Sequence, residues 1–266
     1  MNKKMLLCLL FVFQRLFAAF EIQTIQPDLI ALGGVVSTRP NGLNPAAIGE
    51  TGGLRFDAVY SNLFGLKDLQ SWNGNVAWAD ASGTNAFRLS VGAFGGEIYQ
   101  ERTLQASFGR AVRQFLRVGV AVDYYHLSVA GYENAGSLGV TAGAKFYPTD
   151  NWRLSILYAN VNQPKLSGSR EKLPQAFAVG CQYFWEPRLE IDAEIFKDTL
   201  FPFSFRVGTR VNLWRGLNGL IGFQSNPDRF SGGLNLTLGK FRFDFAAQHH
   251  VSLPLTFYVG CGFQIK

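Results

Sequence analysis

The chain has 266 residues, of which 47% are apolar and only 17% are charged, and it contains 29 glycines and 24 phenylalanines. This composition is too apolar for a disordered protein, and no internal stretch offers the roughly 18 uninterrupted apolar residues of a membrane helix. The formal net charge of +6 includes three basic residues among the first nineteen, so the remainder carries 22 basic and 19 acidic residues, or +3. We therefore expect no nucleic-acid partner.

The first nineteen residues have the order of a secretory signal peptide. Lys3 and Lys4 precede an apolar stretch from Met5 to Phe13, and small residues follow at Ala18 and Ala19. A basic start, an apolar centre and small residues at the cleavage site are the three parts of such a signal. We predict a cleaved signal peptide over residues 1–19, and hence export of the protein.

Residues 20–53 differ from the rest of the chain because they are rich in turn-forming residues. They contain Ala31-Leu32-Gly33-Gly34, the run from Arg39 to Ala46 with two prolines, and glycines at positions 49, 52 and 53. Apolar pieces this short are hard to stabilise alone. If residues 54–266 form a barrel, we expect this segment to pack inside it.

The stretch from Phe115 to Tyr147 predicts a β-hairpin. Apolar residues alternate with small or polar ones from Leu116 to Tyr124, and again from Leu138 to Phe146, which is the period of a strand. Each strand has about ten residues or more, the length that a tilted strand needs to cross a bilayer. A soluble sandwich could also bury the apolar face, so this hairpin alone does not separate the two architectures.

The alternation of short and long connections favours a transmembrane barrel. Every second connection is tight, as at 148–151 and 239–240, and the intervening ones tend to be longer, as at 163–173. Outer-membrane barrels have short periplasmic turns and longer outer loops. We predict an all-β, transmembrane antiparallel barrel of about fourteen strands, with twelve as the alternative, in the bacterial outer membrane. The expected strands are residues 54–63, 73–80, 86–96, 102–112, 115–128, 136–147, 151–162, 174–185, 188–199, 202–213, 217–225, 230–239, 240–249 and 255–265.

Several short motifs resemble one family of such barrels. Ala31-Leu32-Gly33-Gly34, Asn44-Pro45-Ala46 and the run from Tyr60 to Leu66 resemble the N-terminal hatch and first strand of FadL-type transporters of hydrophobic compounds, and more closely their PorV/PorQ-like relatives. Residues 225–233 and 241–246 resemble the final hairpins of the PorV-like group. The resemblance implies a barrel whose lumen holds residues 20–53 as a hatch, with Asn44, Pro45 and Ala46 inside it.

The same resemblance suggests where a solute could pass. In FadL-type proteins a kinked third strand opens sideways, and here the third predicted strand contains Gly95 and Gly96 directly after Phe94. Adjacent glycines favour a bulge or a bend. We therefore predict a substrate path through Asn44, Pro45, Ala46, Phe94, Gly95 and Gly96. The alternative is that the two glycines only end the strand near an outer loop.

Charged residues on the ninth and tenth predicted strands indicate a polar lumen. Glu190, Asp192 and Glu194 share one face, and a short connection would set Glu194 opposite Arg206 and Glu190 opposite Arg210. Arginine facing lipid at mid-depth costs about 2–4 kcal/mol, so these groups must point inward. Two interpretations follow: the groups bind a solute, or they form a network that fills the barrel and holds the hatch. Arg242 and Asp244 extend the same network.

No pattern of catalytic or metal-binding residues occurs in the sequence, which lacks a phosphate-binding glycine loop, a nucleophile elbow and a cysteine or histidine cluster. We expect neither an enzyme, nor a cofactor, nor a bound metal. The leading hypothesis is a FadL/PorV-like barrel that passes small hydrophobic compounds across the outer membrane. The alternatives are an accessory barrel of a type IX-like secretion system that docks exported proteins, and a purely structural protein. The expected partners are membrane lipid, together with small apolar ligands or secretion-system proteins.

Overall fold

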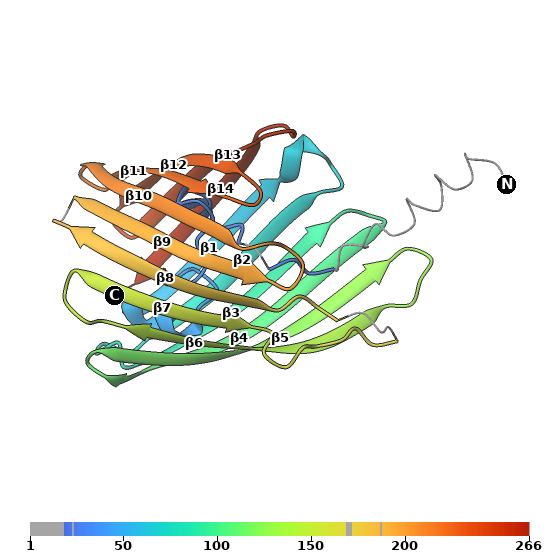
Figure 1. Ribbon diagram of the computed structural model, residues 1–266, viewed down its shortest axis with the longest axis horizontal. Coiled ribbons are helices and arrows are strands. Elements are labelled where there is room, and N and C mark those ends of the chain that lie inside the picture. Colours follow the sequence, from blue (N-terminus) through green and yellow to red (C-terminus); the bar gives the residue numbers. More distant parts are fainter. Residues whose placement is uncertain (1–18, 23, 169–171, 187, 266) are drawn as a thin grey trace.

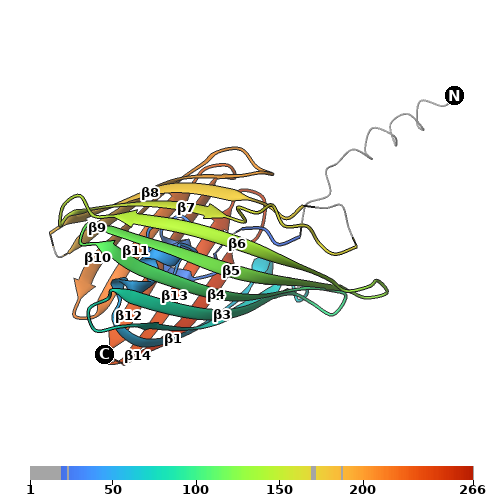
Figure 2. The same cartoon turned by 90° about the horizontal axis from the view of Figure 1, so that it is seen from below.

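The computed structural model describes residues 19–22, 24–168, 172–186 and 188–265. Within them, fourteen antiparallel strands close into a single barrel, with β1 paired to β14 (Figures 1 and 2). The predicted fold class is therefore confirmed, with fourteen strands rather than twelve. The predicted signal peptide lies outside the described residues, apart from Ala19. The strands are β1 (Gly53–Asn62), β2 (Gln70–Ala79), β3 (Asn85–Gly95), β4 (Tyr99–Arg113), β5 (Leu116–Val129), β6 (Ala135–Phe146), β7 (Trp152–Ala159), β8 (Ala176–Trp185), β9 (Leu189–Asp198), β10 (Ser204–Trp214), β11 (Leu217–Gln224), β12 (Arg229–Leu238), β13 (Phe241–His250) and β14 (Thr256–Ile265).

The two ends of the barrel differ in their connections. We call the end with residues 63–69 and 160–175 the loop end, and the opposite end, with residues 80–84 and 239–240, the turn end. One connection at the loop end, residues 96–98, is shorter than the pattern predicts. The end of β7 at Ala159 is also earlier than expected. Asn160 adopts a positive φ of 55°, and its side-chain amide donates to the carbonyl of Pro174 at 2.8 Å.

The strand alternation sorts side chains between the outside and the lumen. On β5, Val118, Val120 and Val122 are 39–47% exposed on the outer surface, whereas Arg117 and Asp123 are buried inside. Large apolar side chains on the other strands follow the same rule, and the exterior includes exposed tryptophans at strand ends (Trp72, Trp152, Trp185 and Trp214). An apolar exterior with aromatic residues at its margins is suited to contact with lipid.

Residues 20–52, which we call the luminal segment, lie inside the barrel (Figures 1 and 2). Position 23 is not described. The segment contains a short helix, α2 (Pro27–Ala31), and a 3₁₀ helix, η1 (Pro45–Glu50), which begins at the capping side chain of Asn44. A second 3₁₀ turn, η2 (Leu63–Gly65), follows β1. Among the described residues, no helix is long and apolar enough to span a membrane.

The apolar core of the protein lies between the luminal segment and the inner wall. Leu29, Leu32 and Val35 pack with Leu220 of β11 and Tyr258 of β14. Further along, Val36 packs with Leu157, Ala178 and Phe196, and Ile48 packs with Ala77, Ala79 and Ala86. Burial of these side chains is worth about 1.5–3 kcal/mol for each of the larger ones. The barrel is therefore filled by its own chain over much of its length.

Candidate functional site

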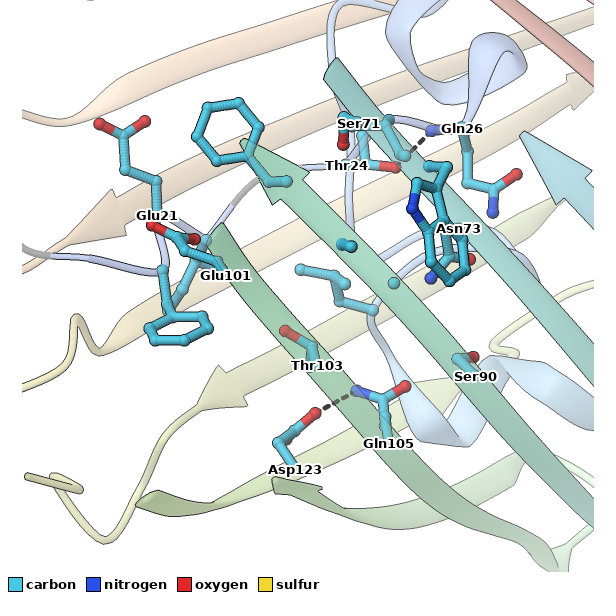
Figure 3. A pocket seen from close by; sticks show the side chains of 18 of the residues that line it. Glu21, Thr24, Gln26, Ser71, Asn73, Ser90, Glu101, Thr103, Gln105 and Asp123 are labelled. Carbon is cyan, nitrogen blue, oxygen red and sulfur yellow. Dashed lines mark hydrogen bonds between the residues drawn. The ribbon is translucent and has the colours of Figure 1, made fainter. Parts of the chain in front are cut away.

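A cavity of about 530 Å³ lies in the loop-end half of the lumen (Figure 3). Its walls are residues 20–22, 24–26 and 41–43 of the luminal segment, the connection after β1, and the inner faces of β2 to β5, with single residues from β6, β7 and β12 to β14. Small-molecule sites in proteins usually have volumes of about 300–1,000 Å³. The cavity is therefore large enough for a small organic solute.

One side of the cavity is polar because the inward positions of neighbouring strands carry amide and hydroxyl groups. Figure 3 shows these side chains along β2, β3 and β4, where they come from Ser71, Asn73, Ser90, Thr103 and Gln105. They recur at every second residue of β2 and β4, as the strand period requires. At the base of this wall Gln105 donates to Asp123 at 2.6 Å and accepts from Arg88 at 3.1 Å.

The cavity also has an apolar part of its lining. Phe20, Ile22 and Ile25 of the luminal segment line it, together with Leu63 and Phe64 from the connection after β1. The ring of Phe20 packs on Tyr125 with a centroid distance of 4.9 Å, and the ring of Phe64 meets His250 edge-on at 4.8 Å. The cavity thus presents both polar and apolar groups to any solute.

The predicted charge ladder forms between β9 and β10, and it reaches the luminal segment. The register sets Glu194 opposite Arg206, and Arg206 donates to the Glu194 carboxylate at 3.3 Å. The same carboxylate accepts from the backbone N–H of Ser37 at 2.7 Å and from its hydroxyl at 2.6 Å. Arg206 also donates to the carbonyl of Gly34 at 2.7 Å. Both charges therefore bind the luminal segment as well as each other.

A second cluster of the ladder is organised by Arg39 of the luminal segment. Its guanidinium lies 2.6 Å from Asp192 and 2.8 Å from Glu190. Burial alone would lower the pKa of Arg39, but the two carboxylates raise the pKa above its usual value. Arg210 contacts this cluster at longer range, 3.7 Å from Asp28 and 4.0 Å from Glu190. Sequence reasoning missed Arg39, because nothing in the segment's pattern indicates which strand it meets.

The remaining predicted charges join strands to one another. Arg242 donates to Asp244 on its own strand at 2.8 Å and to Asp57 of β1 at 2.9 Å. Another pair missed by sequence reasoning ties the luminal segment to β6, where Lys145 donates to Glu50 at 2.7 Å. Most of the charge network thus lies outside the cavity and contacts protein groups.

Asn44, Pro45 and Ala46 lie at the start of η1, fully or almost fully buried against β4 to β6. The Asn44 amide donates to the carbonyls of Ser37 at 3.1 Å and Ile156 at 3.2 Å, and its oxygen accepts from the N–H of Ala46 at 3.0 Å. In the described part of the chain these three residues do not line the cavity. Of the predicted path, Phe94 does line it.

The predicted bend at Gly95 and Gly96 is wrong. In the fully described stretch 70–113, β3 pairs without a register shift with β2 up to Gln70 opposite Gly95, and with β4 up to Gly95 opposite Gln100. Gly95 has a positive φ of 114°, and the N–H of Gly96 donates to the carbonyl of Tyr99 at 2.9 Å. The two glycines therefore end the strand and start a tight turn, and the wall is hydrogen-bonded on both sides of Gly95.

A closed antiparallel barrel with an apolar exterior and a polar, filled interior defines the class: a transmembrane barrel of the outer-membrane type. No protein-family model matches the sequence, and no curated protein matches it. Among solved structures, the chain is similar to the CymD monoaromatic hydrocarbon channel, with a TM-score of 0.72 and 12% identity over 93% of this chain and 99% of that chain.

Two further structures agree. A Pseudomonas aeruginosa FadL homologue matches with a TM-score of 0.68 and 11% identity, over 94% of this chain and 100% of that chain. The Pseudomonas putida toluene transporter TodX matches with a TM-score of 0.68 and 12% identity, over 93% and 99% of the two chains. At this level of identity the similarity establishes a FadL-type barrel fold. Two of these three structures are named as a channel and a transporter, and none is named as an enzyme.

Proposed function

We propose that this protein is an outer-membrane channel that passes small hydrophobic compounds inward. The observation that carries the proposal is the cavity of about 530 Å³ at the loop end, in a barrel that shares its fold with proteins named as hydrocarbon channels. The loop end faces the exterior of the cell, and the chain is exported by a signal peptide over residues 1–19. A solute enters at the loop end and first occupies the cavity.

We further propose that residues 20–53 act as a hatch. Support comes from the apolar contacts of Leu32, Val36 and Ile48 with the inner wall, and from the bonds of Glu194 and Asp192 to the same segment. A lumen filled in this way keeps water and ions from flowing through the turn-end half. The polar network is then structural, and the solute is held in the cavity rather than by the charges.

The proposal is tested by filling the cavity. Thr103 points into the cavity from β4, whereas its neighbour Leu104 is 46% exposed on the outer surface. We expect Thr103→Trp to abolish uptake of radiolabelled toluene by cells of a host that lacks its own hydrocarbon channels. Leu104→Trp, the matched control on the same strand, should take up toluene at the rate of the unmodified protein. Equal uptake by both variants would contradict a route through the cavity.

The second candidate is a PorV-like barrel with an accessory role in protein secretion. The molecules that copurify with the protein distinguish this role from a channel. Native mass spectrometry of the protein, extracted gently from its own membrane, should find an apolar small molecule bound in the channel. A stoichiometric protein partner without a small molecule would instead favour the accessory role. No feature of the described loops specifically favours that role.

A further inference from the structure

Several buried polar atoms that line the cavity have no hydrogen-bond partner within the described part of the protein. They are the side-chain oxygens of Gln26 and Asn75, Nε2 of His250 and Nε of Arg88 and of Arg229. The side chains of Gln26, Asn75, His250 and Arg88 are more than nine-tenths buried, with exposed fractions of 5–7%. A buried polar group without a partner is costly, and such groups are rare in folded proteins. Their convergence on one cavity indicates a ligand that carries hydrogen-bonding atoms.

The unpartnered atoms come from different elements around the same space. Gln26 belongs to the luminal segment just before α2, Asn75 lies on the inner face of β2, and His250 is the last residue of β13. The apolar wall of Phe20, Ile22 and Ile25 bounds the same cavity. A ligand that satisfied the polar atoms and also covered this apolar wall would need a polar group and an apolar body in one molecule.

Two charged residues of the cavity, Arg88 and Asp123, are already engaged by the protein. Arg88 donates to the carbonyls of Gly42 at 2.7 Å and Pro40 at 3.2 Å. The carboxylate of Asp123 accepts from Gln105 at 2.6 Å and from Thr141 at 3.1 Å. Charges of both signs line the cavity, and neither sign is concentrated there. The other charged residues of the lining, Glu21, Glu101 and Arg229, are also of both signs. An ionic ligand would therefore lose its hydration and meet repulsive as well as attractive charges.

We infer that the cavity selects an uncharged amphipathic solute, an aromatic or aliphatic alcohol or phenol, over a bare hydrocarbon of the same size. The hydroxyl donates its single hydrogen to the side-chain oxygen of one amide, Gln26 or Asn75, and accepts from the NH₂ group of the other, and the apolar body packs against Phe20 and Ile25. A hydroxyl both donates and accepts, so it satisfies an amide in either orientation. This inference rests on the proposed function, because it names the substrate class of the same cavity.

Three fluorinated probes of similar size test the inference: 4-fluorophenol, 4-fluorotoluene and 4-fluorobenzoate. Binding to the full-length protein in nanodiscs is followed by fluorine NMR and compared with empty nanodiscs, which corrects for partition into lipid. We expect saturable binding of 4-fluorophenol with a Kd at least about tenfold lower than that of 4-fluorotoluene, the effect of about one net hydrogen bond. We expect no saturable binding of 4-fluorobenzoate.

Three substitutions assign the binding to the cavity. Gln26→Leu and Asn75→Leu should each weaken binding of 4-fluorophenol about tenfold and leave 4-fluorotoluene unchanged or bound more tightly. Gln182→Leu is the matched control: Gln182 is 3% exposed and its oxygen also lacks a partner, but it does not line the cavity. The control should bind both probes like the unmodified protein. Gln26 and Asn75 lie on different elements. If one of these two variants does not fold, the other still tests the inference.

The outcomes separate this inference from the proposed function. Equal binding of 4-fluorotoluene and 4-fluorophenol, tightest binding of 4-fluorobenzoate, or unchanged phenol binding by both variants would overturn the inference. Toluene uptake that Thr103→Trp blocks would still uphold the channel in each of those cases. Conversely, selective binding of 4-fluorophenol in nanodiscs without uptake of toluene or phenol by cells would uphold the ligand class and reject transport.

Discussion

Glu194 and Arg206 illustrate how buried charges of this lumen act at the scale of single residues. Each contacts the other, but each also makes a shorter bond to the luminal segment, to Ser37 and to Gly34 respectively. Arg210 lies four residues further along the same strand. Its side chain is more exposed than that of Arg206, and its contacts with Asp28 and Glu190 are long, at 3.7 and 4.0 Å. Arg206 therefore contributes more than Arg210 to binding the luminal segment, although both are arginines on β10.

This difference predicts unequal effects of two substitutions. Arg206→Met should lower the free energy of unfolding by about 3–5 kcal/mol, because it leaves the buried Glu194 without its cation. Arg210→Met should cost about 1 kcal/mol or less, because its charge is partly solvated and its partners are distant. Urea unfolding in detergent measures both. We expect toluene uptake at unchanged rates per folded barrel, and altered uptake at unchanged stability would instead indicate a solute-binding role.

At the scale of elements, strands β4 to β6 accept η1 because glycine faces it from the wall. An added Cβ at Gly119 of β5 would lie 2.4 Å from the carbonyl carbon of Pro45 and 2.5 Å from the nitrogen of Ala46. Both neighbours are backbone atoms, which cannot turn aside as a side chain can. The position therefore requires glycine for the close approach of two chain segments.

Gly119→Ala should weaken the packing of η1 against β5. We expect a loss of about 1–3 kcal/mol in the free energy of unfolding, typical of overpacking, and faster cleavage of the luminal segment by added protease. Gly74→Ala is the control, because the nearest atom to its added Cβ is the carbonyl oxygen of Asp57 at 3.9 Å. Its effect should be within about 0.5 kcal/mol. Equal losses of unfolding free energy in the two variants would show that the packing of η1 does not depend on glycine at position 119.

At the scale of the whole molecule, the closed wall and the filled lumen restrict the routes by which a solute could cross the barrel. Residues 28–50 are anchored to the barrel by the apolar clusters and by ion pairs of Asp28, Arg39 and Glu50. Residues 20–22 and 24–26 lie outside this anchored part and border the cavity, together with residues 41–43 of the anchored part. This distribution predicts that the anchored part stays in place while a solute passes, and that any rearrangement is confined to the part beside the cavity.

A reversible crosslink tests that prediction. The hydroxyl oxygens of Ser37 and Ser155 lie 2.9 Å apart, so cysteines at both positions can join the luminal segment to β7. The native Cys181 and Cys261 are first replaced by alanine. We expect the oxidised Ser37→Cys, Ser155→Cys variant to take up toluene as fast as the reduced one. Uptake that stops on oxidation and returns with a reductant would mean that the anchored part must move.

The sequence by itself determined the barrel and the pairing of its charges. Alternation such as that from Leu116 to Tyr124 separates lipid-facing from lumen-facing positions within one strand, and strand period is a local property of the chain. A hairpin with a short connection then has few possible registers. For that reason Glu194 could be placed opposite Arg206, and the pairing was confirmed.

Only the tertiary structure decided the turn at Gly95 and the cavity. A Gly-Gly pair suits a bulge or a turn equally, and the choice depends on the simultaneous pairing of Gly95 with Gln70 and Gln100. The polar wall includes Ser71, Asn73 and Asn75, which alternate along β2, but its meeting with Gln26 depends on the path of the luminal segment through the lumen. That path is set by packing against many strands at once, a non-local condition that no short pattern in the chain encodes.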